Sequence, residues 1–163
     1  MARLGHIYRE HFQETRRERL FLASIAFFVS YAVVRLIAHA IRAGVGPFHN
    51  LSVGQTHIHH LVWGITLLLL VGYGWLIQIG TGQGRSSLLI SRCMSVLYGI
   101  GAALTLDEFA LWLRLEDVYW TREGRASVDA TLLFGALISA GVWGGPFLRA
   151  VTGHLIGGLR RRR

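Results

Sequence analysis

The chain has 163 residues, of which 52% are hydrophobic, and a mean hydropathy of +0.42. It carries 17 basic residues, all of them arginine, against nine acidic ones, for a net charge of +8. Such a charge is also found in nucleic-acid-binding proteins, but here the apolar residues form long blocks, so we expect no nucleic-acid partner. Cys93 is the only cysteine, which excludes a disulfide within the chain.

Four apolar blocks predict an all-α, polytopic membrane protein with four transmembrane helices. They run over residues 20–41, 57–79, 88–113 and 128–151, and together they define a transmembrane domain over residues 20–151. Each block has about 20 residues or more, which is enough for a helix to cross the roughly 30 Å of hydrocarbon in a bilayer. Strands of a membrane barrel would be about 10 residues long with alternating apolar residues, a pattern that this sequence does not show.

Residues 1–19 precede the first block as a basic segment that mixes apolar side chains with arginines and glutamates. This segment is either an amphipathic helix on the inner membrane surface or a solvated tail. Because it is long and polar, and because the apolar stretch after it exceeds the core of a usual signal peptide, we expect the first helix to be retained. Along that helix Tyr31, Arg35, His39 and Arg42 form one stripe, because residues three or four apart share a helix face.

The second block begins with a histidine-rich segment, Gln-Thr-His-Ile-His-His, at residues 55–60. On a helix, His57 and His60 would lie about 60° apart and could share one ligand. His59 would point elsewhere, so all three imidazoles converge only if the start of the helix is irregular.

The third block contains two adjacent acids, Asp107 and Glu108, and Glu116 follows it. A charged side chain at the centre of a membrane helix costs about 2.5–3.5 kcal/mol. Asp107 and Glu108 therefore need partners, and ionisable residues within membrane segments point by default to a functional site. Tyr119 and Trp120 mark the outer end of this helix as interfacial anchors.

Arginine is distributed unevenly between the two sides of the predicted bundle. Four arginines fall on the side of the first and third connections, whereas twelve fall on the other side: Arg3, Arg9, Arg16, Arg17, Arg19, Arg85, Arg92, Arg149 and Arg160–Arg163. The positive-inside rule then makes residues 1–19 and the arginine-rich tail at residues 152–163 cytoplasmic, with the tail against anionic lipid. The histidines, the acids, Arg35 and His39 consequently share the outer half of the membrane.

Three explanations fit this outer group of polar residues, and the first is a divalent metal. Imidazole and carboxylate ligands together suit zinc, iron or manganese. Such a metal would activate water or oxygen for a lipid-soluble or periplasmic substrate in a membrane-embedded metalloenzyme, although the sequence leaves open whether the protein is an enzyme. The metal ligands that we predict are His57, His60, Asp107, Glu108 and His59, followed by His39 and Glu116.

The second explanation pairs Arg35 with Asp107 or Glu108, which would neutralise charge in a non-catalytic membrane module with a structural ion-pair cluster. The third is a proton or ion path, because desolvation and a neighbouring like charge favour the neutral form of a carboxyl group. Four helices enclose little volume, so such a path would need a homo-oligomer. Membrane lipids are partners in all three explanations.

Two motifs within residues 55–130 resemble a family of small bacterial integral membrane proteins. The first is His-Ile-His-His-Leu-Val at residues 57–62. The second is Leu-Asp-Glu-Phe-Ala-Leu-Trp-Leu at residues 106–113, continued by Glu-Asp-Val-Tyr-Trp at 116–120, Glu-Gly-Arg at 123–125 and Ser-Val-Asp-Ala at 127–130. The resemblance implies a bacterial inner membrane. It implies no activity, substrate or cofactor, so the function has to be argued from the residues.

Overall fold

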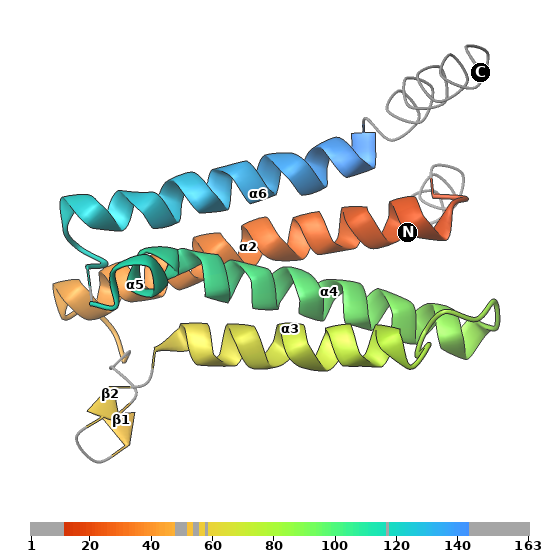
Figure 1. Ribbon diagram of the computed structural model, residues 1–163, viewed down its shortest axis with the longest axis horizontal. Helices are drawn as coiled ribbons and strands as arrows, with labels where there is room; N and C mark the ends of the chain where they lie inside the picture. Colours follow the sequence, from red (N-terminus) through yellow and green to blue (C-terminus); the bar gives the residue numbers. More distant parts are fainter. Residues whose placement is uncertain (1–11, 48–51, 54–55, 58, 117, 144–163) are drawn as a thin grey trace, which may run out of the picture.

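The computed structural model describes residues 12–47, 52–53, 56–57, 59–116 and 118–143. Long helices dominate this part of the chain (Figure 1), namely α2 (Thr15–Ala43), α3 (His60–Leu76), α4 (Arg85–Asp107) and α6 (Arg125–Trp143). Shorter elements connect them: strands β1 (Ser52–Val53) and β2 (Thr56–His57), helix α5 (Phe109–Arg114) and the 3-10 turn η1 (Arg122–Gly124). Apart from the two-residue antiparallel ladder of β1 and β2, the described residues form an all-α fold.

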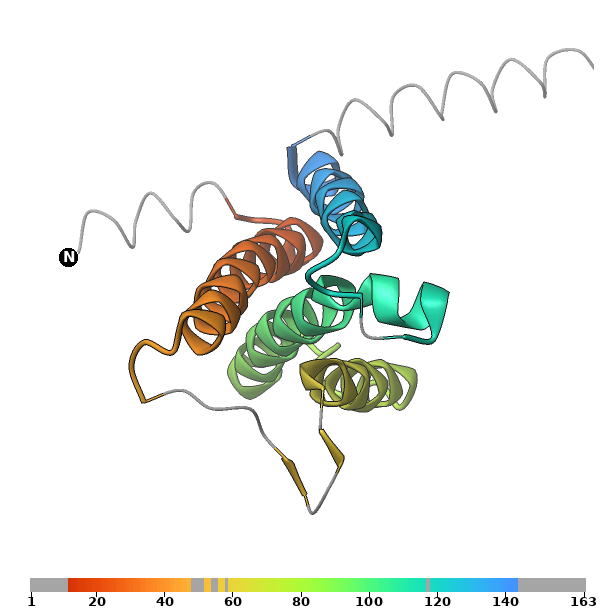
Figure 2. The same ribbon diagram turned by 90° about the vertical axis from the view of Figure 1, so that its left-hand side faces the viewer.

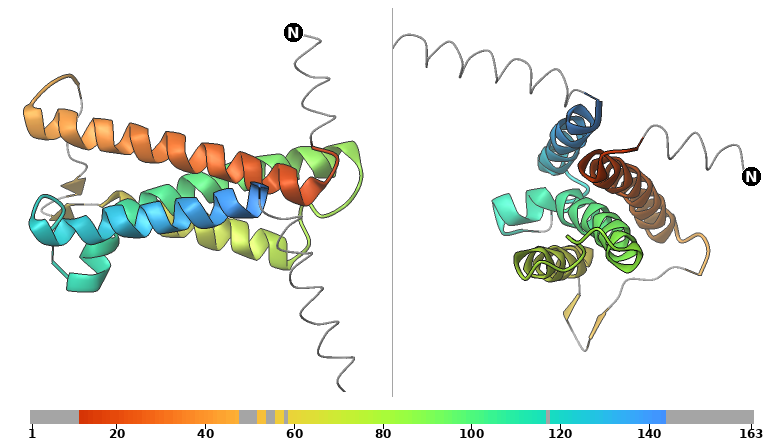
Figure 3. Two further views of the ribbon diagram at one scale, coloured as in Figure 1. Left: turned by 90° about the horizontal axis from the view of Figure 1, so that it is seen from above. Right: turned by 90° about the vertical axis from the view of Figure 1, so that its right-hand side faces the viewer.

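The long helices form an antiparallel bundle with α4 at its centre. Helix α4 packs against α2 and α3, while α6 lies against α2 and α4, as the view along the bundle shows (Figure 2). The start of α2, the connection from α3 to α4 and the end of α6 lie at one end, which we call the Glu18 end (Figure 3). The end of α2, the start of α3, the end of α4 and α5 lie at the other, the Asp107 end.

Helix α2 is longer than the first predicted helix, residues 20–41. It begins at Thr15 because residues 15–19 contain neither glycine nor proline, so the helix continues beyond its apolar part into the polar segment. It ends before Gly44, which has a φ of 65°. The N–H groups of Gly44 and Val45 donate to the carbonyls of Ile41 and Ala40, which is the usual way in which glycine terminates a helix.

Small residues allow α4 to approach its neighbours closely. A methyl group added to Gly64 of α3 would lie 2.7 Å from the backbone nitrogen of Thr105 and 2.8 Å from the carbonyl oxygen of Gly101. Between the two ends of the bundle, a hydrophobic cluster contains Phe27, Ala102, Ala103 and Ile138, and the buried hydroxyls of Ser95 and Thr131 lie on the same helices.

The second and third helices differ from their predicted ranges at the Asp107 end. Helix α3 begins at His60 rather than at residue 57, because His57 belongs to β2 and His59 is still extended. The third predicted helix, residues 88–113, is interrupted at Glu108, which separates α4 from α5. As a result, the start of α3, the end of α4 and the start of α5 all lie beside the two acids.

Apolar helices long enough to cross a membrane agree with the predicted class of protein. Among the described residues, three segments meet the length and composition for a span, namely Thr15–Ala43, Arg85–Asp107 and Arg122–Trp143. Helix α3 is apolar but has only 17 residues. Most of the predicted basic segment 1–19, the end of the fourth predicted helix and the tail 152–163 lie outside the described residues.

Candidate functional site

Asp107 lies at the centre of a polar cluster at the Asp107 end of the bundle. Its side chain has 0% exposure. Its Oδ2 accepts hydrogen bonds from His60 Nε2 at 3.1 Å and from the Tyr119 hydroxyl at 2.7 Å. Its Oδ1 lies 2.6 Å from Arg35 Nε, although the N–H is not aligned with it, so this contact is an ion pair rather than a directed hydrogen bond. Asp107 is the last residue of α4, where the helix dipole disfavours a negative charge, so these partners are needed.

Glu108 contacts the start of α3, whereas Arg35 belongs to α2. Its Oε2 accepts a hydrogen bond of 2.9 Å from the backbone N–H of Leu61, in the first turn of α3. Its Oε1 accepts a bond of 2.7 Å from His59 Nδ1. His59 precedes α3 without capping it through its own side chain, so Glu108 supplies the acceptor and the negative charge that a helix N-terminus favours.

His60 lies between the two acids. Its Nε2 donates to Asp107, and its Nδ1 lies 3.5 Å from Glu108 Oε2. The imidazole ring of His60 is thus within 3.5 Å of both carboxylates. We call the group formed by Arg35, His59, His60, Asp107 and Glu108, together with Tyr119, the Asp107–Glu108 cluster.

Aromatic rings hold the guanidinium of Arg35 in place. Its carbon Cζ lies 4.7 Å from the ring centre of Tyr119 and 5.4 Å from that of Tyr31. Such stacking contributes about 0.5–2 kcal/mol, more where water is excluded. Burial and the negative charge of Asp107 raise the pKa of Tyr119 well above its ordinary value, so this hydroxyl stays a donor.

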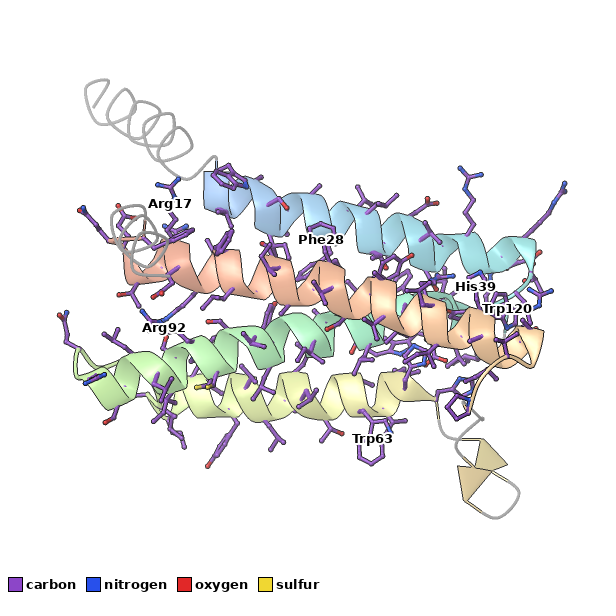
Figure 4. All side chains as sticks on the ribbon, turned by 180° about the vertical axis from the view of Figure 1, so that it is seen from behind. Arg17, Phe28, His39, Trp63, Arg92 and Trp120 are labelled. Atoms are coloured by element: carbon purple, nitrogen blue, oxygen red, sulfur yellow. The ribbon has the colours of Figure 1, made fainter. Side chains whose placement is uncertain are left out.

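His39 is exposed and lies beside Trp120 rather than in the cluster, as Figure 4 shows. The ring centres of His39 and Trp120 are 5.0 Å apart, and Arg42 stacks on Trp120 at 4.3 Å. The Nδ1 of His39 donates to the carbonyl oxygen of Arg35 at 2.7 Å, because a carbonyl only accepts. The predicted stripe on α2 therefore holds the segment that contains Tyr119 and Trp120.

Of the remaining predicted ligands, Glu116 lies at the edge of the cluster, near His59. Glu116 is exposed, and it lines an open depression of about 590 Å³ together with His59 and the apolar side chains of Leu111, Trp112 and Leu115. His57 belongs to β2, and its side chain lies outside the described part of the structure.

The sequence reasoning missed two members of the arrangement. Tyr119 was expected only as an interfacial anchor, although its hydroxyl reaches Asp107. The backbone N–H of Leu61 carries no signal in the side-chain pattern, and only the late start of α3 after His59 exposes it to Glu108.

The donors as arranged do not form a metal site within the described residues, where no group of three or more histidine, cysteine, aspartate or glutamate side chains could hold an ion. His59 Nδ1 and Glu108 Oε1 are 2.7 Å apart. Two ligands on a tetrahedral zinc ion are separated by about 3.3 Å, so this contact is a hydrogen bond. Because the side chain of His57 is not described, a metal site that includes it stays a prediction.

A second polar group lies at the Glu18 end. The Nε of Arg92 lies 2.9 Å from Glu18 Oε1. Arg19 donates from Nε to Ser91 Oγ at 2.6 Å and from Nη2 to the carbonyl of Gly80 at 3.0 Å. We call these five residues the Glu18–Arg92 cluster; they connect α2, α4 and the α3–α4 connection.

No family model, curated protein or solved structure matches the chain. The resemblance to bacterial membrane proteins therefore stays a prediction, and the function rests on the two clusters and the helices that carry them.

Proposed function

We propose that this chain is a small protein of the bacterial inner membrane in which α2, α3, α4 and α6 all cross the bilayer. The 17 residues of α3 rise about 26 Å, which is at the short end of what a span requires. The antiparallel order of the helices then leaves both termini on the side of the Glu18 end. The excess of arginine on that side supports a cytoplasmic location for it.

Within this membrane protein, the Asp107–Glu108 cluster acts as a structural ion-pair cluster of a non-catalytic module. One observation carries the proposal: Asp107 has no exposed surface, and its partners come from α2, α3 and the segment between α5 and η1. A buried carboxylate with partners from three separate elements fixes those elements relative to one another. The cluster thus joins the outer ends of the helices to the segment that faces the periplasm.

A double-mutant cycle on Arg35 and Asp107 tests this role. Arg35→Gln leaves a buried carboxylate without its cation, and breaking a buried pair in this way costs about 3–5 kcal/mol. Asp107→Asn in the same chain removes the charge that Arg35 compensated, so the double variant should be more stable than the sum of the two single effects predicts. The measurement is reversible unfolding in mild detergent, followed by circular dichroism.

Arg42→Gln is the matched control. Arg42 belongs to the same helix as Arg35, and it stacks on Trp120 rather than pairing with an acid of the cluster. Its effect should be below about 1 kcal/mol. Additive effects of Arg35→Gln and Asp107→Asn, with no coupling, would refute the structural pairing.

A metal site that uses His57 and His60 is the second candidate. It is favoured by the chain order, because β2 ends at His57 and a third histidine therefore stands only three residues before His60. Elemental analysis of protein purified without an affinity-tag metal decides between the candidates. Zinc, iron or manganese near one equivalent, lost in both His60→Ala and Asp107→Ala, would replace the structural proposal. Wild-type protein that takes up none of the three ions, even when they are offered, would support it.

A proton path stays a prediction. The hydrophobic cluster of Phe27, Ala102, Ala103 and Ile138 lies between the Asp107–Glu108 cluster and the Glu18–Arg92 cluster, but the buried side chains of α4 and α6 also include Ser95 and Thr131.

A further inference from the structure

The surface of the bundle has a mostly apolar groove near the Glu18 end, between α2 and α4. Its volume is about 430 Å³, and it is lined by Leu22, Arg92, Cys93, Val96 and Leu97. Among the described residues that line the groove, Arg92 alone is charged. The groove lies beside the Glu18–Arg92 cluster, and Figure 4 shows Arg92 at that end of the bundle.

Arg92 stands where the polar part of the bundle meets the apolar part. Its Nε contacts Glu18 in the first turn of α2, and the apolar run of α2 begins two residues later at Leu20. Two of the apolar lining residues lie deeper in the bundle. Leu22 comes four residues after Glu18 on α2, and Val96 comes four residues after Arg92 on α4, which is about 6 Å further from the Glu18 end. In the proposed orientation, Arg92 therefore lies at the level of the lipid headgroups and the groove continues into the hydrocarbon.

The charges of the Glu18–Arg92 cluster do not cancel. Glu18 contacts Arg92, while Arg19 donates to the neutral groups Ser91 Oγ and Gly80 O. Within this cluster, two arginines and one glutamate leave a net positive charge. The side chain of Arg92 contacts Glu18 through Nε, lines the groove and is 46% exposed, so its guanidinium is accessible to a ligand there. A planar guanidinium can donate two N–H groups to one phosphate, which a compact ammonium group does not do.

We propose that this groove binds an anionic phospholipid of the inner leaflet, with its phosphate on Arg92 and one acyl chain along Leu22, Val96 and Leu97. The inference rests on the proposed transmembrane orientation. A zwitterionic phospholipid would bring its own ammonium group to a mouth that is already positive, so the site prefers a lipid with net negative charge. A groove of about 430 Å³ falls within the usual size range of ligand pockets.

The single cysteine provides the readout, because Cys93 lines the groove and is exposed. The full chain, delipidated in a mild non-ionic detergent, is labelled with a maleimide while phosphatidylglycerol or phosphatidylcholine is added to the micelles. Phosphatidylglycerol should slow the labelling of Cys93 more than phosphatidylcholine does. In Arg92→Gln the affinity for phosphatidylglycerol should fall about fivefold, the value expected for one arginine near an anionic lipid.

Arg85→Gln is the matched control. It removes the same charge from the first residue of α4, two turns before Arg92 and outside the groove lining. An anionic micelle also changes the reactivity of any thiol by altering its ionisation, and this general effect is common to all variants. Arg85→Gln should therefore keep the preference for phosphatidylglycerol.

A second variant, which keeps Arg92, tests the groove even if Arg92→Gln fails to fold. Leu97→Trp should fill the groove, lower the basal labelling rate and abolish the lipid dependence while the helix content stays unchanged. Equal losses in Arg85→Gln and Arg92→Gln, equal protection by the two lipids, or a lipid preference that persists in Leu97→Trp would each overturn the site. These results would leave the Arg35–Asp107 cycle untouched, so a failure here is distinguishable from a failure of the proposed function.

Discussion

The two ends of the bundle each pair an acid with an arginine of another helix, but in different surroundings. The contacts are 2.6 Å for Arg35 with Asp107 and 2.9 Å for Arg92 with Glu18. The side chain of Arg35 is 20% exposed and that of Arg92 is 46% exposed. Both acids are buried, at 0% exposure for Asp107 and 7% for Glu18, so the two pairs differ mainly in how far water reaches the arginine. Because water screens the more exposed arginine, the Arg92–Glu18 pair should contribute less.

The partners of each arginine differ in the same sense. Arg35 stacks near Tyr31 and Tyr119, so its orientation is fixed on both sides. Arg92 lines the apolar groove and is more exposed, and no ring contact of its guanidinium is found among the described residues. We infer that Arg35 holds helices together at the Asp107 end, whereas the proposed role of Arg92 at the Glu18 end is to bind a lipid phosphate.

The largest expected effect compares the two arginines directly. Arg35→Gln should destabilise the protein by about 3–5 kcal/mol, and Arg92→Gln by less, because the side chain of Arg92 is more exposed to water than that of Arg35 and Glu18, although buried, keeps 7% exposure against 0% for Asp107. Thermal and denaturant unfolding of both variants in one detergent measures the difference. Equal effects would mean that burial does not distinguish the two ends.

The next effect compares the contacts of α3 at the two ends. A methyl group at Gly64 would meet the backbone of Thr105 and Gly101, which cannot move aside, so Gly64→Ala should cost about 1–3 kcal/mol. A methyl group at Gly74, nearer the Glu18 end, would meet the flexible end of Met94 at 2.8 Å, and Gly74→Ala should cost less.

Gly72→Ala serves as the control for these glycines, because no atom lies within 4 Å of its added methyl group. Alanine favours helix by up to about 1 kcal/mol over glycine, so this variant should be neutral or stabilised. Unfolding measurements on the three variants check the order. A Gly64→Ala protein as stable as Gly72→Ala would contradict the close approach of α3 to α4.

The gathering of residues at the Asp107 end could be predicted from the sequence. Antiparallel helices bring the start of the second block, the end of the third and the outer half of the first to one level, which places His59, His60, Asp107, Glu108 and Arg35 together. The sequence left open which acid Arg35 contacts. The structure selects Asp107, because it is the last residue of α4 and lies toward α2, whereas Glu108 lies toward α3.

The helix break at Glu108 could not be predicted, because no glycine or proline marks it. Tertiary contacts produce it: Glu108 binds the N–H of Leu61, and the first turn of α5 is satisfied when Ala110 N–H donates to Ser127 Oγ of α6. In the hydropathy pattern, residues 88–113 form one continuous apolar block, so the pattern predicts one helix there. The contact of Tyr119 with Asp107 also depends on a chain reversal after α5, where Leu115 takes a φ of 58° that its residue type does not suggest.

A smaller effect separates Glu108 from Asp107 within one cluster. Glu108→Gln keeps an acceptor for Leu61 but loses the charge at the start of α3, so it should cost about 0.5–2 kcal/mol, the range for a lost helix cap. Hydrogen exchange of the amides of His60, Leu61 and Val62 should accelerate more than exchange elsewhere. Glu116→Gln is the control, because Glu116 is exposed. Unchanged exchange at the start of α3 would show that Glu108 does not cap it.

The smallest effect is a pH dependence that Tyr119 gives to the Asp107 end. Burial and the charge of Asp107 raise the pKa of Tyr119, so the folded protein keeps this proton at pH values where the unfolded chain releases it. The contribution of Tyr119 to stability is therefore complete below about pH 10 and is lost as the pH rises. By about pH 10.5 the loss should reach about 0.8 kcal/mol.

Unfolding free energies of wild type, Tyr119→Phe and Tyr73→Phe, measured from neutral pH to pH 10.5, isolate this contribution. Tyr119→Phe should have the shallower decline, because phenylalanine has no proton to lose in either state. Tyr73→Phe should keep the wild-type slope, because the side chain of Tyr73 is exposed. Parallel declines in all three proteins would mean that Tyr119 ionises as easily in the folded protein as in the unfolded chain. In that case the hydroxyl would not be held against a buried, charged Asp107, and the contrast between the two ends would rest on Arg35 alone.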